Sequence, residues 1–106
     1  MAIDKTIAAL ADPTRRALLH RLASNPCRAG DLARGFAMSR PAVCKHTRIL
    51  GRAGLIRAKK NGRERIYELA PGGRDAVELL IKKLEEVGAF WDTALGAFKR
   101  YLEEKQ

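Results

Sequence analysis

Apolar residues in the first half of the chain recur at helical spacing in short segments separated by turn residues. Residues 3–11 predict a first helix, and Asp12 followed by Pro13 is typical of the N-cap and first turn of a second helix. Pro26 ends this second helix, because proline cannot continue the helical hydrogen-bonding pattern. We expect three residues to form its apolar stripe: Ala17, Leu18 and Leu22.

A third and a fourth helix are predicted over residues 29–36 and 40–53, with a tight turn at residues 37–39 between them. Ser39 has the side chain that N-caps prefer, and Gly54 is typical of the position after a last helical turn. The apolar side chains that we expect in the core are Leu32 and Phe36 in the third helix, and Val43, Ile49 and Leu50 in the fourth.

The pattern changes from helical to strand-like over residues 55–69. Asn61 and Gly62 lie between two β-prone runs, which is the strongest short-range signal of a β-hairpin. A two-residue turn at this pair sets the cross-strand partners that we expect: Lys60 with Arg63, and Lys59 with Glu64.

Pro-Gly-Gly at residues 71–73 breaks the chain, and a long helix is predicted over residues 74–104. Its apolar residues include four that are spaced seven positions apart, which places them in one continuous stripe. A chain of 106 residues has little else to cover so long a stripe, so we expect a second copy to pack on it. The expected dimer interface comprises Val77, Leu80, Leu84, Val87, Trp91, Leu95 and Phe98.

The net charge of +9 is concentrated in one continuous part of the chain. Residues 34–65 hold ten Lys or Arg residues and one acid, Glu64, whereas the rest of the chain balances 11 basic with 11 acidic residues. Such a localised block is typical of a protein that binds a polyanion. A solvated face or an anionic membrane surface would also tolerate these charges, but a basic helix followed by a basic ribbon favours duplex DNA.

The order of elements predicts a mainly α fold with a small β-wing, namely a winged helix-turn-helix. The length suits a single domain over residues 1–106, with a DNA-binding core at about 12–70 and dimerisation helices at about 3–11 and 74–104. In this fold the second helix of the motif enters the major groove, and the wing follows the neighbouring backbone or minor groove. Arg40, in the first turn of that helix, can offer a bidentate fork to a guanine or clamp a phosphate, and we expect it to read a base edge. The expected DNA-binding residues are Ser39, Arg40, Pro41, Cys44, Lys45, His46, Arg48, Lys59, Lys60, Arg63 and Arg65.

Cys27 and Cys44 are too few for a disulfide framework, and we expect reduced thiols in the cytoplasm, with Cys27 as a small buried residue. We see neither a secretory signal pattern nor an apolar run that could span a membrane. Cys44 and His46 do not form a nucleophile and base, because two positions along a helix are separated by about 200°. With no carboxylate pair, phosphate loop or metal-ligand spacing, we expect no enzymatic activity, no cofactor and no bound metal.

The segments "ALADPTRRALLHRLA" and "GDLARGFAMSRPAVCKHTRILGRAGLIRAKKNGRERIYEL" resemble the ArsR/SmtB family of small dimeric bacterial repressors, and the likeness extends over about residues 5–104. The resemblance implies a homodimer that binds operator DNA through the fourth helix and the wing. Arg28 and Gly30 stand where the metal-sensing branch has thiolates, and the last helix has no histidine, so the family's usual metal sites are not expected. Cys44 replaces a usual serine and Thr47 a usual leucine.

Together these observations favour a homodimeric, sequence-specific transcriptional repressor that binds an inverted-repeat operator. One alternative is a repressor that responds to thiol oxidation at Cys44, where neighbouring cations and a helix N-terminus favour the thiolate. Another is an architectural or protein-interaction module whose winged helix does not read sequence. The sequence identifies no small-molecule or redox inducer.

Overall fold

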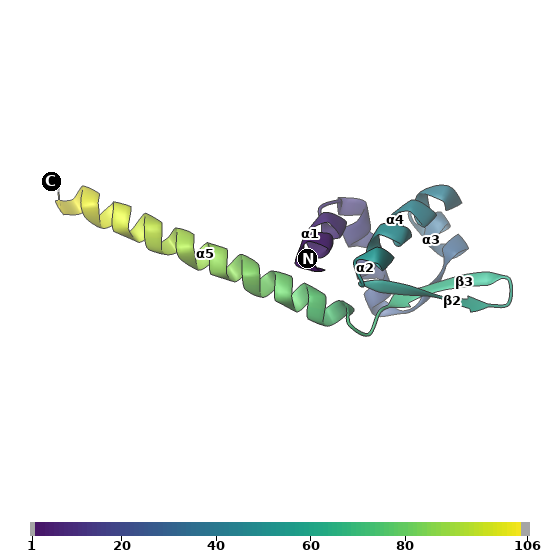
Figure 1. The fold of residues 1–106 in the computed structure, drawn as a ribbon. Coiled ribbons are helices and arrows are strands. Elements are labelled where there is room, and N and C mark those ends of the chain that lie inside the picture. The colour runs from purple at the N-terminus through teal and green to yellow at the C-terminus, as the bar shows by residue number, and fades with distance from the viewer. Residues whose placement is uncertain (1, 105–106) are drawn as a thin grey trace.

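The computed structural model describes residues 2–104, which form a head of short helices and strands from which one long helix extends (Figure 1). The predicted mainly α fold with a small β-wing is confirmed. In chain order the elements are α1 (Ala2–Leu10), α2 (Pro13–Ser24), β1 (Cys27–Arg28), α3 (Ala29–Gly35), α4 (Arg40–Arg52), β2 (Ile56–Asn61), β3 (Glu64–Leu69) and α5 (Gly73–Glu104).

Helices α2 and α4 begin where their capping residues predict. The Asp12 carboxylate accepts a hydrogen bond of 3.0 Å from the Arg15 backbone N–H at the start of α2. This bond is the main reason that the pKa of Asp12 lies below its ordinary value. Leu18 and Leu22 of α2 are buried as predicted, but the prediction for Ala17 is wrong, because α2 turns this residue towards solvent.

One apolar cluster fills the head and fixes the orientation of α4. Leu32 is buried as expected, whereas Phe36 and Ile49 only partly enter the core. Thr47 is buried despite its hydroxyl group, which donates a hydrogen bond of 2.8 Å to the Val43 carbonyl oxygen one turn earlier. The buried members of the cluster are Ala9, Leu18, Leu22, Cys27, Leu32, Ala33, Val43, Leu50, Leu55, Ile56 and Tyr67.

The wing is part of a three-stranded antiparallel sheet with the order β1-β3-β2, and not the two-stranded ribbon that the sequence predicts. The additional strand is β1, in which Cys27 pairs with Tyr67 and Arg28 with Ile66. It ties the segment between α2 and α3 to the central strand of the wing. A strand of two residues is too short to show any alternation, which is why the sequence pattern did not indicate it.

The predicted register of the hairpin is also wrong. Asn61 pairs with Glu64, so the two turn residues are Gly62 and Arg63 instead of Asn61 and Gly62. Gly62 has a φ of +66° and takes the first central position of the turn, the position that type II′ hairpins give to glycine. The cross-strand partners near the tip are consequently Lys60 with Arg65, and Lys59 with Ile66.

Helix α5 has 32 residues, which at 1.5 Å per residue corresponds to a rod of about 48 Å. Its first turns pack on the head, where Val77 is half-buried against the core and Leu80 is buried. The rest continues away from the head, which gives overall dimensions of 72 × 27 × 22 Å (Figure 1). Despite this length, no helix within residues 2–104 is apolar enough to cross a membrane.

Candidate nucleic-acid interface

The outward face of α4 carries only positive charges. Ser39 caps the helix, since its side-chain oxygen accepts a hydrogen bond of 3.3 Å from the Ala42 backbone N–H. Burial of Val43, Thr47 and Leu50 on one side turns the opposite side towards solvent. The residues exposed on that side are Pro41, Lys45, Arg48 and Arg52.

None of these α4 cations has an ion-pair partner within the described part of the chain. Arg52 was not among the residues predicted from the sequence to bind DNA. It lies four positions after Arg48 and seven after Lys45, so the spacing that places the other two on one helix face also includes Arg52. The cationic face therefore extends to the last turn of α4, beyond the residues predicted from the sequence.

His46 is set apart from the other predicted DNA-binding residues. It is half-buried, and its Nδ1 atom lies 3.4 Å from Nη1 of Arg15. Arg15 also donates hydrogen bonds of 2.7 and 3.1 Å to the backbone carbonyl oxygens of Ala9 and Ala8 at the end of α1. His46 thus faces the junction between α1 and α2 and not the cationic face of α4.

Arg40, in the first turn of α4, lies over α3. A methyl group built on Gly30 would lie 2.5 Å from the Arg40 Nη2 atom, so the absence of a side chain at Gly30 gives the guanidinium group its place. Five positions along a helix correspond to about 140° around its axis, which separates Arg40 from Lys45. The structure therefore places Arg40 beside α3 and not among the cations on the outward face.

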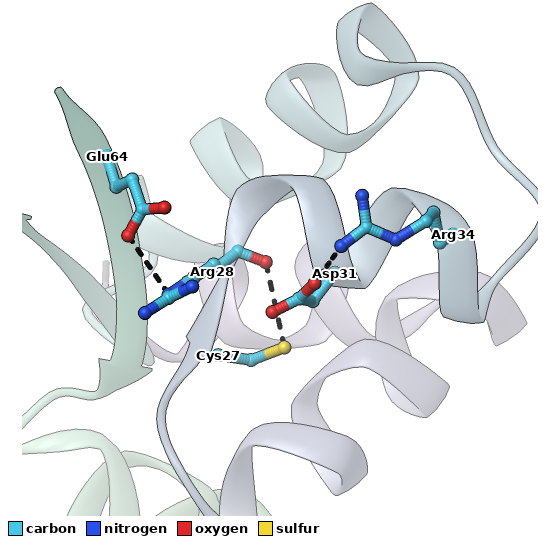
Figure 2. A network of polar contacts seen from close by, with 5 residues as sticks. All are labelled: Cys27, Arg28, Asp31, Arg34 and Glu64. Atoms are coloured by element: carbon cyan, nitrogen blue, oxygen red, sulfur yellow. Dashed lines mark hydrogen bonds and ion pairs between the residues drawn. The ribbon is translucent and has the colours of Figure 1, made fainter.

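A polar cleft of about 220 Å³ lies between α3 and the wing. Two ion pairs lie beside it: Arg28 with Glu64 at 3.0 Å, and Arg34 with Asp31 in the next turn of α3 (Figure 2). Both pairs are largely exposed, so they contribute little to stability. The cleft contains more arginines than carboxylates, and an anion is its natural ligand. Its arginines are Arg28, Arg34, Arg40, Arg63 and Arg65.

The four predicted wing cations differ in their surroundings. Lys59 pairs with Glu68 at 3.0 Å, and Arg57 approaches the same carboxylate at 3.3 Å. The hydrogen bond from Lys59 is the first cause that holds the pKa of Glu68 below its ordinary value. Lys60, Arg63 and Arg65 form no ion pair with any described residue, so they are the wing cations available to a ligand.

The two cysteines lie in different environments. Cys27 is buried as expected, and its thiol lies 3.6 Å from the Arg28 carbonyl oxygen (Figure 2). Cys44 is half-buried at a small cavity between α4 and the wing, which Arg48 and Arg65 also line. Over residues 2–104 no three His, Cys, Asp or Glu side chains meet in a way that could hold a metal ion.

Helix α5 presents an uncovered apolar surface away from this cationic region. Ten of its large apolar side chains are between 45% and 68% exposed. Of the predicted dimer contacts, Leu84, Val87 and Trp91 belong to this surface, and so do Leu95 and Phe98. Val77 and Leu80 instead pack mainly on the head of their own chain.

Comparisons with known proteins agree with this geometry. Residues 12–58 match the family described as "Bacterial regulatory protein, arsR family". The HTH-type transcriptional regulator Rv2034 of Mycobacterium tuberculosis (strain ATCC 25618 / H37Rv) is 36% identical over 102 residues, which cover 96% of this chain and 90% of the relative. The transcriptional repressor SdpR of Bacillus subtilis (strain 168) is 34% identical over 67 residues, 63% of this chain and 74% of SdpR.

A solved structure shows a similar fold over nearly the whole chain. The ArsR-like transcriptional regulator from Rhodococcus sp. RHA1 is 35% identical, with a TM-score of 0.79. The match covers 97% of this chain and 92% of that structure. The likeness therefore includes α5 as well as the head.

Proposed function

Because this chain belongs to the bacterial ArsR family and is a DNA-binding transcriptional regulator, we propose that it is a homodimeric repressor that binds an inverted-repeat operator in the cytoplasm. The observation that carries the proposal is the outward face of α4, where Lys45, Arg48 and Arg52 lie with no carboxylate partner among the described residues. An α-helix fits the major groove of B-DNA, and a run of unpaired cations suits its phosphate-lined walls.

The two basic elements have different tasks in this proposal. Lys45 and Arg48 lie in the middle of the exposed face, where side chains of an inserted helix reach base edges. Lys60 and Arg63 lie at the wing tip, where phosphates are the nearer targets. Base contacts specify the sequence, and phosphate contacts position the protein along the duplex.

The exposed apolar surface of α5 supports the homodimer. Soluble monomers rarely leave a continuous apolar patch of this extent in water, and a second copy of the chain would cover it. A two-fold symmetric dimer presents two α4 helices in opposite directions, so the operator is an inverted repeat. Its half-site centres lie about one helical turn, or a multiple of it, apart.

Repression is the mode of action that we propose, because SdpR is a transcriptional repressor and is 34% identical to this chain over 67 residues. A dimer bound across a promoter blocks access of the transcription machinery. No enzymatic step is needed for this action.

The test begins with selection of bound sites from a random DNA pool, followed by salt titrations of affinity on the selected site and on a scrambled duplex. Arg48→Ala should weaken binding to the selected site by about 1–3 kcal/mol and affect the scrambled duplex much less. Arg21→Ala removes the same charge from the exposed surface of α2 and serves as the control. Failure to enrich any sequence, or equal losses of affinity on the selected and the scrambled duplex, would favour the non-sequence-specific module instead.

A further inference from the structure

A large apolar cavity lies between α2 and the first turns of α5, and its lining within residues 2–104 includes no residue of α4. Its volume of about 610 Å³ is typical of small-molecule sites, which span about 300–1,000 Å³. Leu69 of the central strand is 41% exposed there, and Ile7 is the only other exposed large apolar residue described before α5. A ligand with an apolar chain would remove this surface from water. The aliphatic walls comprise Leu10, Leu19, Ala23, Leu55, Leu69 and Val77.

Two arginines from different helices also line the cavity. Arg16 of α2 donates one hydrogen bond of 2.8 Å to the Leu10 carbonyl oxygen and forms no ion pair with any described residue. A guanidinium group has five N–H donors, so Arg16 can still bind a carboxylate. Arg74 of α5 pairs with Glu78 at 2.7 Å, but both side chains are more than half exposed, so little energy holds this pair together. Two arginines and one glutamate leave one positive charge unbalanced beside the apolar walls.

We propose that this cavity binds a small amphipathic carboxylate, with its aliphatic chain against the leucine walls and its carboxylate group on Arg16 and Arg74. The single unbalanced charge matches one carboxylate group. Among the described residues no Phe, Tyr or Trp side chain lines the cavity, so the walls suit an aliphatic chain better than a flat ring that would stack on them. The bound molecule is therefore of the fatty-acid class.

The cavity also contacts the segment that joins α4 to the wing, and this contact links the ligand to DNA binding. The Leu55 carbonyl oxygen, between α4 and β2, accepts a hydrogen bond of 3.0 Å from the Ala70 backbone N–H. A methyl group built on Gly73 would lie 2.7 Å from the same oxygen, so the first turn of α5 packs closely on this segment. All three residues line the cavity. A ligand that widens the cavity should shift α4 and the wing relative to α5 and lower operator affinity, an effect that rests on the proposed function.

Isothermal titration calorimetry of the full chain with decanoate, below the concentration at which it forms micelles, tests the site. One decanoate should bind per chain, and 1-decanol, which has the same chain without the charge, should bind at least about tenfold more weakly. Arg16→Gln should weaken decanoate binding by a similar factor. Arg21→Gln is the matched control, because Arg21 also lies exposed on α2 and donates one hydrogen bond to a backbone carbonyl oxygen, that of Asn25. Equal losses in the two variants would show attraction by overall charge and refute the site.

Two further variants change the cavity in opposite directions. Glu78→Gln frees Arg74 from its pair and should strengthen decanoate binding about twofold to fivefold. Ala23→Phe fills the cavity from an exposed position of α2 and should abolish binding. Wild-type affinity in Ala23→Phe would place decanoate elsewhere, such as on the exposed apolar side chains of α5, and would overturn the proposal. A changed sedimentation coefficient in Ala23→Phe would show instead that a second copy of the chain occupies the cavity, which also contradicts it.

The link to DNA is measured separately, on the duplex selected from the random pool. Saturating decanoate should lower the affinity of the wild-type protein for this duplex about fivefold or more, and the same concentration should have little effect on Arg16→Gln. Decanoate binding with unchanged operator affinity would refute the regulatory role of the cavity. If no DNA sequence is selected while decanoate still binds, the proposed function fails and the ligand site stands.

Discussion

The substitution Gly30→Ala tests how Arg40 contributes to DNA binding. The added methyl group would lie 2.5 Å from the Arg40 Nη2 atom, too close for both to keep their positions. The end of an arginine side chain is flexible, so we expect the guanidinium group to leave its place over α3 while the backbone stays unchanged. Gly30 lies within α3, where alanine is the better helix former, and the free energy of unfolding should stay constant or rise by up to about 1 kcal/mol.

The effect on DNA follows from the cleft between α3 and the wing. Arg40 is one of five arginines around a space of about 220 Å³, which suits a phosphate group of the DNA backbone. A charge-assisted hydrogen bond contributes about 1.5–3 kcal/mol, and the affinity loss for Gly30→Ala should fall in this range for each protomer bound. Each lost phosphate contact also lowers the slope of log affinity against log salt by about 0.9, so a homodimer should lose about two units.

Fluorescence anisotropy over a salt series, with selected and scrambled duplexes, measures both quantities. Gly30→Ala and Arg40→Ala should weaken binding to the two duplexes by similar factors, and their combination should be no weaker than Arg40→Ala alone. Gly35→Ala is the matched control in the same helix, because a methyl group there meets no atom within 4 Å. A loss confined to the selected duplex in Arg40→Ala would show that Arg40 reads a base, as the sequence first indicated. If Gly30→Ala bound both duplexes with wild-type affinity, the position of the Arg40 guanidinium group over α3 would not matter for DNA binding.

Three further predictions concern the head and the wing. Arg15→Ala removes the side chain that caps the last carbonyl groups of α1, and should lower the free energy of unfolding by about 1–3 kcal/mol in urea titrations; an unchanged midpoint would contradict the capping role. The lowered pKa of Asp12 means that its charge stabilises the fold above the unfolded-state pKa, and that this stabilisation is lost as the pH falls through the folded value. Asp12→Asn keeps a capping oxygen but has no carboxyl group that can take up a proton. Its free energy of unfolding should therefore fall less than that of the wild type between about pH 7 and about pH 3, and equal losses would exclude Asp12 as the cause. Lys60→Ala should reduce the salt slope of DNA binding more than Lys59→Ala, because Lys59 is already paired with Glu68, and the reverse order would show that this pair opens on DNA.

Most of the fold could be predicted because its helices carry strong local signals. Asp12 with Pro13, and Ser39 before α4, mark helix starts that depend only on nearby residues. The errors arise where distant contacts decide the outcome. The sequence of β1 contains no strand signal, and its pairing with β3 exists only because the head brings the two together. Likewise, the turn accepts Gly62 at either central position, and the pairing along the whole hairpin selects the first.

In the candidate site, too, the features set by nearby residues could be predicted and those set by distant contacts could not. Charge content and helical spacing correctly indicated a basic α4 and a basic wing, because both are properties of short segments. The position of the Arg40 side chain depends on Gly30 in α3, which has no side chain to block it. The position of the His46 ring depends on its contact with Arg15 in α2. Neither contact leaves a trace in the local pattern. The four predicted wing cations are indistinguishable in the sequence, whereas in the structure Lys59 is paired with the carboxylate of Glu68, five residues beyond the tip.

The position of β2 at the edge of the sheet affects how the wing can be altered. An edge strand has backbone groups with no partner on one side, and an uncharged edge invites pairing with another chain and aggregation. Lysines and arginines on such a strand prevent this contact by repulsion and by their need for water. The cations of β2 therefore protect solubility as well as offering charge to a ligand. A variant that removes Arg57, Lys59 and Lys60 together should precipitate on concentration, so its loss of DNA binding would have to be measured at nanomolar protein, below the onset of association.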